Sequence, residues 1–244
     1  MKSSSLYIKA IASLTAASLC FFGTFPSEAA GELTHAFRSD PERGVWCHGD
    51  YDDGETRIAL TFDDGPHRIY TEKVLDVLER YGVRATFFVI GSNVEDYPEL
   101  VLREIAAGHE IGSHTYSHLH IIGQSEESIE EELRHCENVL RDCASVRPRL
   151  FRPPEGVYGE GVLRAAAAFG YKVIYWSVDT RDWTHPSVEK IVDNVLNNTR
   201  GGSIILFHDF AVGKSETIEA LEKIIPELQK RGYEFVTVSE LIGE

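Results

Sequence analysis

Two adjacent carboxylates, Asp63 and Asp64, begin the first of five reactive clusters in this 244-residue chain. They directly follow the apolar stretch 57–62 and precede Gly65-Pro66. Neighbouring carboxylates raise each other's pKa, which makes such a pair costly. A bound metal ion would remove that cost, with one aspartate as a ligand and the other left as a base. The alternative is a plain Asp-Gly-Pro turn, because such turns are common.

Two histidines, His114 and His118, follow the stretch 110–113, which we interpret as a strand. Four residues apart, they can converge on one ion through a helical turn or a tight loop. Together with Asp64 they form a two-histidine, one-carboxylate set that leaves positions open for water and substrate. A pair of surface imidazoles is the alternative. His120 is a spare donor that we otherwise interpret as part of the wall or the surface.

Three more clusters follow later apolar stretches. His208 has the chemistry of a general acid with a pKa near neutrality, or of a structural core histidine. Arg152, before a Pro-Pro turn, could lower the pKa of a carboxylate or make an ordinary ion pair. Asp182 could orient His208, and Trp183 could stack on a sugar face; a charged loop with a core tryptophan is equally compatible. Five such clusters at successive strand ends argue against coincidence.

The elements that must position these residues alternate along the chain. Apolar, β-branched or aromatic runs predict strands at 57–62, 84–90, 110–113, 150–152, 171–178, 202–207 and 234–238. Helical periodicity predicts helices at 71–81, 100–108, 125–142, 159–169, 187–199 and 215–231. This alternation predicts a parallel α/β fold, whose sites form at the carboxyl ends of the strands. Periodicity does not choose between a doubly wound sheet and a barrel.

The five clusters, in this order, resemble the motifs of the polysaccharide deacetylases of carbohydrate esterase family 4. The matching stretches are 61–65, 114–118, 152–156, 179–183 and 206–208. The resemblance runs from about residue 57 to 240 and is highly specific. It implies an α/β fold, a distorted (β/α) barrel of about seven parallel strands.

The resemblance also implies a role for each site residue. The metal ligands would be Asp64, His114 and His118. Asp63 would be the general base, tuned by Arg152, and His208 the general acid, tuned by Asp182. The acetyl-binding pocket would be lined by Trp183 and Leu206. Glu155 stands where the family usually has tyrosine; the backbone N–H there helps to hold the oxyanion, so the donor survives while an added carboxylate alters the rim.

The activity that these roles imply is metal-dependent hydrolysis of N-acetyl groups on N-acetylglucosamine residues of an extracellular polysaccharide, with release of acetate. Peptidoglycan is the first expected substrate and chitin-like polymers the next. We expect Zn²⁺, although a two-histidine, one-aspartate site also accepts Co²⁺ or Mn²⁺. The alternatives are an O-acetyl esterase of the xylan type and a non-catalytic glycan-binding protein.

The N-terminus has the pattern of an export signal. Lys2 and Lys9 are followed by an apolar run at 10–25 and a Ser-x-Ala pattern ending at Ala29. We therefore expect a signal peptide at 1–29, an N-terminal arm at 30–56 and a catalytic domain at 57–244. An uncleaved membrane anchor is the alternative, and either places the enzyme in the cell envelope or outside the cell.

Charge and cysteine content exclude other classes of protein. The net charge of −15 would repel a phosphate backbone, so we expect no nucleic-acid partner. No Cys-x-x-Cys pair is present, which argues against a zinc ribbon. We expect Cys47, Cys136 and Cys143 to be buried free thiols.

Overall fold

The computed structural model describes residues 39–49, 54–157, 159–210 and 215–244. The expected signal peptide at 1–29 and part of the expected arm lie outside these residues, and both stay predictions. Within the described ranges, no helix is both long enough and apolar enough to cross a membrane. Cys136 is a buried free thiol as expected and Cys47 is buried, whereas Cys143, also expected to be buried, is a half-buried free thiol.

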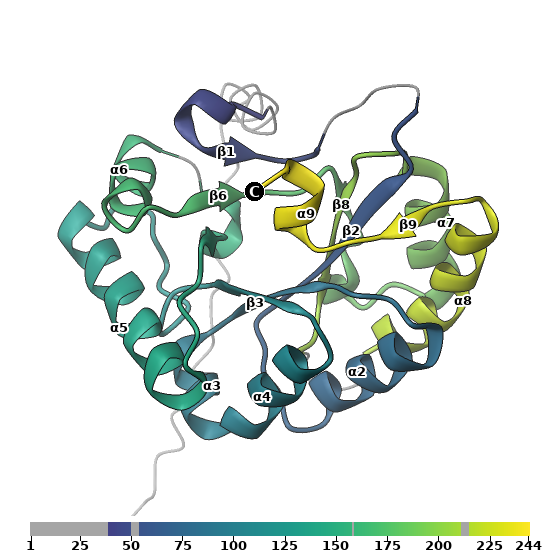
Figure 1. The fold of residues 1–244 in the computed structure, drawn as a ribbon, viewed down its shortest axis with the longest axis horizontal. Coiled ribbons are helices and arrows are strands. Elements are labelled where there is room, and N and C mark those ends of the chain that lie inside the picture. Colours follow the sequence, from purple (N-terminus) through teal and green to yellow (C-terminus); the bar gives the residue numbers. More distant parts are fainter. Residues whose placement is uncertain (1–38, 50–53, 158, 211–214) are drawn as a thin grey trace, which may run out of the picture. The chain divides into compact units, whose positions relative to one another are not determined.

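One curled parallel sheet forms the centre of the fold (Figure 1). Its strands are β1 (Val45–Trp46), β2 (Arg57–Asp63), β3 (Thr86–Val89), β4 (Glu110–Ser113), β5 (Leu150–Phe151), β6 (Lys172–Ile174), β7 (Val178–Asp179), β8 (Ile204–His208) and β9 (Glu234–Phe235). The order is β1-β6-β5-β4-β3-β2-β8-β7, and β9 pairs with β2. Helices cover the outside of the sheet. The expected distorted (β/α) barrel is therefore confirmed.

The prediction of one strand over 171–178 was wrong, because this stretch forms two strands. β6 pairs with β5 and β1, whereas β7 pairs with β8 at the other end of the sheet. The chain from Ile174 to Val178 can span at most about 14 Å. The two ends of the sheet must therefore curl toward each other, and the connecting residues cross the remaining gap.

The strand β1 was not predicted, because its surroundings are polar and have little periodicity. It pairs with β6 through Val45 opposite Val173 and Trp46 opposite Ile174. An isolated bridge between His48 and Ser203 attaches the same segment to the start of β8. This part of the expected arm thus contributes backbone hydrogen bonds to the sheet.

The six predicted helices are present, with ends within a few residues of those expected. They are α2 (Tyr70–Tyr81), α4 (Pro98–Ala106), α5 (Glu126–Ala144), α6 (Glu160–Ala168), α7 (Val188–Asn198) and α8 (Thr217–Lys230). The short helices α3 (Gly91–Asp96) and α9 (Val238–Ile242) were not predicted, nor were the 3₁₀ turns η1 (Pro41–Arg43), η2 (Pro154–Gly156) and η3 (Asp182–Thr184). Ser125 caps α5 by accepting a hydrogen bond from the Ser128 N–H, as its side-chain oxygen allows.

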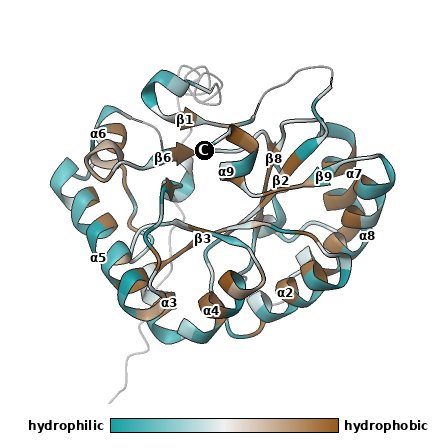
Figure 2. Cartoon of the chain, in the orientation of Figure 1, coloured by the Kyte–Doolittle hydropathy of each residue, from teal (hydrophilic) through white to brown (hydrophobic). Residues whose placement is uncertain are grey.

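The two faces of β2 have different surroundings, because side chains alternate along a strand. Phe62 points into the helix-covered core, where its ring stacks on Phe87 at 5.1 Å and on Phe207 at 5.7 Å between centroids. Thr61 and Asp63 point the opposite way, into the interior of the barrel. Figure 2 shows the matching pattern on the helices, which are apolar toward the sheet and polar outside. This alternation directs Asp63 toward the site described below.

One buried acid lies in the core. Glu104 on α4 is fully buried, and within the described part of the chain neither carboxylate oxygen has a hydrogen-bond partner. Burial, reinforced by the charge of Asp209, raises the pKa of Glu104 well above its usual value near 4.5. When the pKa of a carboxyl group is higher in the folded protein than in the unfolded chain, the free energy of unfolding falls as the pH rises above the unfolded-state pKa.

We predict that Glu104→Leu raises the free energy of unfolding by about 1–3 kcal/mol, because an unsatisfied buried polar group is removed. The gain should be larger at pH 8 than at pH 5. At pH 8 the unfolded wild-type protein has an ionised Glu104, which must take up a proton or enter the core charged when the chain folds, and the leucine variant has no such group. Urea unfolding at both pH values checks this. The exposed Glu99 on the same helix provides the control, Glu99→Leu. An equal gain at the two pH values would contradict the prediction.

Candidate active site

Side chains at or after the carboxyl ends of six strands, β2, β4, β5, β6, β7 and β8, meet in one cavity of about 500 Å³. It is lined by Asp63, Asp64, His114, His118, Glu155, Gly156, Trp176, Asp179, Trp183, Leu206 and His208. Eight of the ten residues expected at the site are in this list; the other two, Arg152 and Asp182, lie behind it in contact with Asp63 and His208. The structure therefore brings together the whole predicted set.

Asp64, His114 and His118 converge as a possible metal site. The Asp64 Oδ1 atom is 3.4 Å from the Nε2 atom of each histidine, and the three ligand atoms lie within 4.8 Å of one another. Asp64 Oδ1 is buried and has no hydrogen-bond donor within the described residues. A divalent cation would satisfy this orphaned oxygen, and two imidazoles with one carboxylate suit such an ion.

The protonation of the ligands fits the same interpretation. Burial opposes ionisation of Asp64, but the neighbouring imidazoles of His114, His208 and His118 outweigh it and lower its pKa to about 2. The Nδ1 atom of His114 lies 2.7 Å from the carbonyl oxygen of Arg152. A carbonyl only accepts, so Nδ1 carries a proton and Nε2 is the ring nitrogen that faces Asp64.

A tight turn after β2 aims Asp64 into the cavity. Asp64 has φ 75°, a left-handed conformation that aspartate adopts more readily than most residues. The Asn93 side-chain amide donates to the Asp64 carbonyl at 2.8 Å and fastens the turn to α3. Gly65 is required next to it, because a Cβ there would lie 2.2 Å from an oxygen of Asp209.

Asp63 is held from below by Arg152. The Arg152 Nη1 atom donates to Asp63 Oδ1 at 2.8 Å and to Thr61 Oγ1 at 2.8 Å. The second carboxylate oxygen, Oδ2, lies 3.9 Å from His114 Nε2 and so faces the possible metal site. One oxygen of Asp63 is thus anchored, and the other is directed at the reaction space.

His208 lies at the end of β8 with Asp182 behind it. The His208 Nδ1 atom is 2.7 Å from Asp182 Oδ1, while Asp182 Oδ2 accepts from the His208 N–H at 2.9 Å and the Thr217 hydroxyl at 2.7 Å. Burial disfavours the charged imidazolium, but the hydrogen bond and charge of Asp182, with the charges of Asp63 and Asp64, outweigh it. The pKa of His208 is raised to about 9.

The rim of the cavity combines apolar and acidic side chains. Trp183 is 57% exposed, whereas Leu206 is buried in the wall. Glu155 adopts φ 59° and forms an ion pair with His120, its oxygens 3.1 Å from Nδ1. His120 therefore belongs to the rim and lies outside the three-residue ligand cluster, consistent with the wall-or-surface interpretation.

Sequence reasoning missed several residues that shape this site. Trp176 and Asp179 line the cavity, and Thr217 supports Asp182 from the start of α8. Trp176 lies inside the run that we interpreted as one strand, so it carried no signal. Asp179 was part of a matched cluster, and its position just before Asp182 was the available hint.

Comparison with known proteins agrees with this geometry. A family model described as polysaccharide deacetylase matches residues 50–174. The chain is 45% identical over 190 residues to a peptidoglycan-N-acetylglucosamine deacetylase of Bacillus cereus, covering 77% of this chain and 89% of that protein. It is 38% identical over 200 residues to a chitooligosaccharide deacetylase of Bradyrhizobium, covering 77% and 91%. The crystal structure of the Bc1960 peptidoglycan N-acetylglucosamine deacetylase superposes with a TM-score of 0.79 at 37% identity, over 83% of this chain and 94% of that one.

We predict that Asp182→Asn lowers the pKa of His208 from about 9, because the hydrogen bond and charge of Asp182 are lost and only the charges of Asp63 and Asp64 still oppose burial. Titration of the metal-free protein, followed by NMR of the imidazole resonances, checks this. Asp179→Asn is the matched control, since Asp179 lines the same cavity without bonding to the His208 ring. An unchanged His208 titration in Asp182→Asn would contradict the assignment.

Proposed function

The chain belongs to the polysaccharide deacetylase family, and from that premise we propose that it removes N-acetyl groups from N-acetylglucosamine residues of an extracytoplasmic polysaccharide, peptidoglycan first. The observation that carries the proposal is the cavity in which Asp63 and His208 flank the cluster of Asp64, His114 and His118. A base, a possible metal site and an acid around one space are what hydrolysis of an amide requires.

A divalent metal ion at the three-residue cluster, Zn²⁺ by preference, would supply a Lewis acid that polarises the acetamide carbonyl and acidifies the attacking water. Asp64, His114 and His118 would hold it. The donor set also suits Co²⁺ or Mn²⁺.

Asp63 acts as the general base. Its Oδ1 atom is engaged by Arg152, so Oδ2 is the oxygen available to take the proton from the attacking water. Arg152 pairs its positive charge with Asp63 and fixes the direction of the carboxylate. Proton removal by a positioned base contributes roughly 10²–10⁴-fold to such rates.

His208 acts as the general acid on the other side of the cavity. Asp182 and the surrounding carboxylates raise the pKa of the imidazole to about 9, so the ring is protonated at neutral pH. Asp182 accepts a hydrogen bond from the Nδ1–H group, so the Nε2–H group is left to deliver its proton to the departing sugar amine. Acetate and a free amine are the products.

The substrate assignment follows the relatives and the wall of the cavity. The relatives are named for peptidoglycan N-acetylglucosamine and for chitooligosaccharides. The acetyl methyl group would pack against Leu206, and a sugar ring against the exposed face of Trp183. The Glu155 backbone N–H would hold the oxyanion, as the family pattern implies. The expected signal peptide supports peptidoglycan, because it places the enzyme in the envelope or outside the cell.

We predict that Asp63→Asn and His208→Ala each lower kcat by about 10²–10⁴-fold, because each removes one proton-transfer group. Bound zinc, measured by metal analysis, should stay near that of the wild type, since neither residue belongs to the ligand cluster. His185→Ala controls for loss of a histidine from the loop after β7. Near wild-type turnover in either site variant would contradict the assigned role.

The substrate is tested by acetate release from peptidoglycan, chitin oligomers and acetylated xylan, side by side. We expect acetate from the N-acetylglucosamine polymers, loss of release with a chelator and recovery with added Zn²⁺. Release from xylan alone would instead identify an O-acetyl esterase. Binding of a polymer with no acetate released from any of the three, in the presence of bound metal, would identify a glycan-binding protein and overturn the proposal.

A further inference from the structure

We propose that Glu132 on α5 is a positioning residue for the possible metal site: its carboxylate fixes the loop between His114 and His118 and thereby sets the place of His118. The inference rests on the proposed metal-dependent function. It concerns a helix that none of the five sequence clusters includes, and a side chain that lies behind the ligands instead of in the cavity.

The two histidine ligands are held in different ways. The backbone N–H of His114 donates to the Val89 carbonyl at 2.9 Å, its Nδ1 atom bonds to the Arg152 carbonyl, and its side chain is 3% exposed. The side chain of His118 is 35% exposed, and its Nε2 atom lies 3.4 Å from Asp64 Oδ1. The place of His118 therefore depends on the backbone that leads to it.

That backbone is in an unusual conformation. Thr115 has φ 68° and His118 has φ 56°, both in the left-handed region that residues with side chains seldom adopt. Such conformations persist where neighbouring groups hold them. The loop carbonyls of Thr115 and Tyr116 accept from the N–H groups of Gly91 and Ser92 at 3.0 and 2.9 Å. These bonds fasten one side of the loop to α3.

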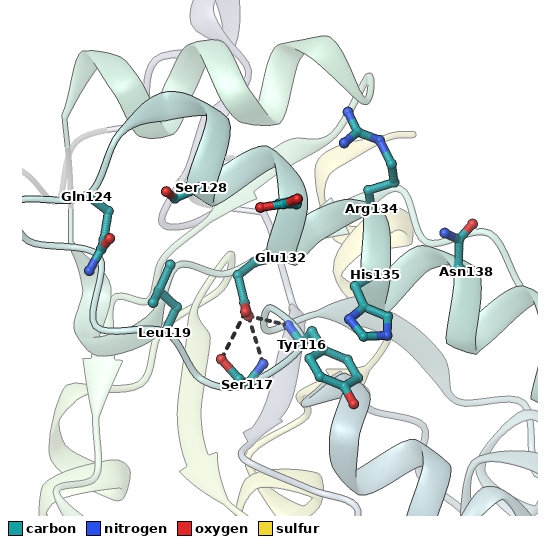
Figure 3. Close-up of a pocket in the computed structure, with 10 residues that line it drawn as sticks. Tyr116, Ser117, Leu119, Gln124, Ser128, Glu132, Arg134, His135 and Asn138 are labelled. Atoms are coloured by element: carbon teal, nitrogen blue, oxygen red, sulfur yellow. Dashed lines mark hydrogen bonds between the residues drawn. The ribbon is translucent and has the colours of Figure 1, made fainter.

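Glu132 fastens the other side (Figure 3). Its Oε2 atom accepts from the backbone N–H of Tyr116 at 2.9 Å and of Ser117 at 2.7 Å, and its Oε1 atom accepts from the Ser117 hydroxyl at 2.9 Å. One carboxylate thus binds both backbone donors of the two residues before His118. Hydrogen bonds to an ionised acceptor are about twice as strong as those between neutral groups.

The helix that carries Glu132 is a rigid platform. The neighbouring Leu133 and Cys136 are fully buried in the core, so α5 cannot shift freely relative to the sheet. His135, three residues on along the same helix, stacks on the ring of Tyr116 with 3.5 Å between centroids and 13° between planes. Figure 3 shows both side chains of α5 directed at the loop. The helix α5 therefore fixes the position of the loop relative to the core.

Loss of the carboxylate should leave the fold in place and let His118 move. The affinity for Zn²⁺ is measured without substrate, by competition with a chromophoric chelator, in the full chain and its variants. We expect Glu132→Ala to bind Zn²⁺ about 10–100-fold more weakly than the wild type, the range seen when groups behind metal ligands are removed. Glu132→Gln, which keeps an acceptor oxygen, should fall between the two.

Glu131→Gln is the matched control. Glu131 is the adjacent acid and lines the same pocket of about 620 Å³, and it makes no ion pair or hydrogen bond to any described residue. The substitution Glu131→Gln removes the same charge one residue nearer to the N-terminus of α5. We expect its Zn²⁺ affinity to stay within twofold of the wild type, so a general effect of helix charge is distinguished from the loop contact.

The outcomes separate this inference from the proposed function. Wild-type affinity in Glu132→Ala, or equal losses in Glu131→Gln and Glu132→Ala, overturns the inference. If Glu132→Ala does not fold, as judged by circular dichroism, Glu132→Gln decides: a several-fold loss with an unchanged Tm supports it, and no loss overturns it. A wild type that binds Zn²⁺ but releases no acetate refutes the function alone; a wild type that binds no Zn²⁺ refutes both.

Discussion

The contact on which most of this structure depends is the buried hydrogen bond and ion pair between Arg152 and Asp63. The Arg152 side chain is fully buried, and burying an unpaired guanidinium would be strongly unfavourable. Its N–H groups donate to Asp63, Thr61 and the carbonyls of Ile174 and Tyr175. The guanidinium carbon also lies 4.1 Å from the centroid of the Phe88 ring. This one side chain thus ties the ends of β2, β5 and β6 together beneath the cavity.

The same contact gives a physical reason for the strand that sequence analysis extended too far. The carbonyls of Ile174 and Tyr175 accept from Arg152 at the point where β6 leaves the sheet. Nothing local in 171–178 indicates this break, because the run is mostly apolar and aromatic and the arginine lies about 20 residues earlier. The site residues themselves were predictable, since reactive side chains such as His114 and His208 directly follow strands that periodicity identifies. Residues recruited by tertiary contact alone, Glu132 and Thr217 among them, were not.

The charge of each buried acid near the cavity depends on the groups that it contacts. Asp182 accepts hydrogen bonds from the imidazole of His208 and the hydroxyl of Thr217. These bonds and the charge of His208 outweigh the effect of burial and lower the pKa of Asp182. Asp209, directly after His208, is bonded by the Thr71 hydroxyl, and burial with the nearby charge of Asp64 raises its pKa to about 7. Asp182 and Asp209 thus differ in charge between about pH 4 and pH 7, and the ionised Asp182 is the one that bonds to the His208 ring.

Among the described residues, those other than glycine that have left-handed backbone are concentrated around the cavity. The non-glycine residues with positive φ are Asp64, Thr115, His118, Ser145, Glu155, Arg181 and His185. Ser145 ends α5, whereas the other six belong to loops at the carboxyl edge of the sheet. Such conformations are unfavourable by about 1–3 kcal/mol each, so they need support from packed elements. Asn93 supplies it at Asp64 and Glu132 beside His118, which means that the helices around the barrel fix the loops that line the cavity as well as cover the core.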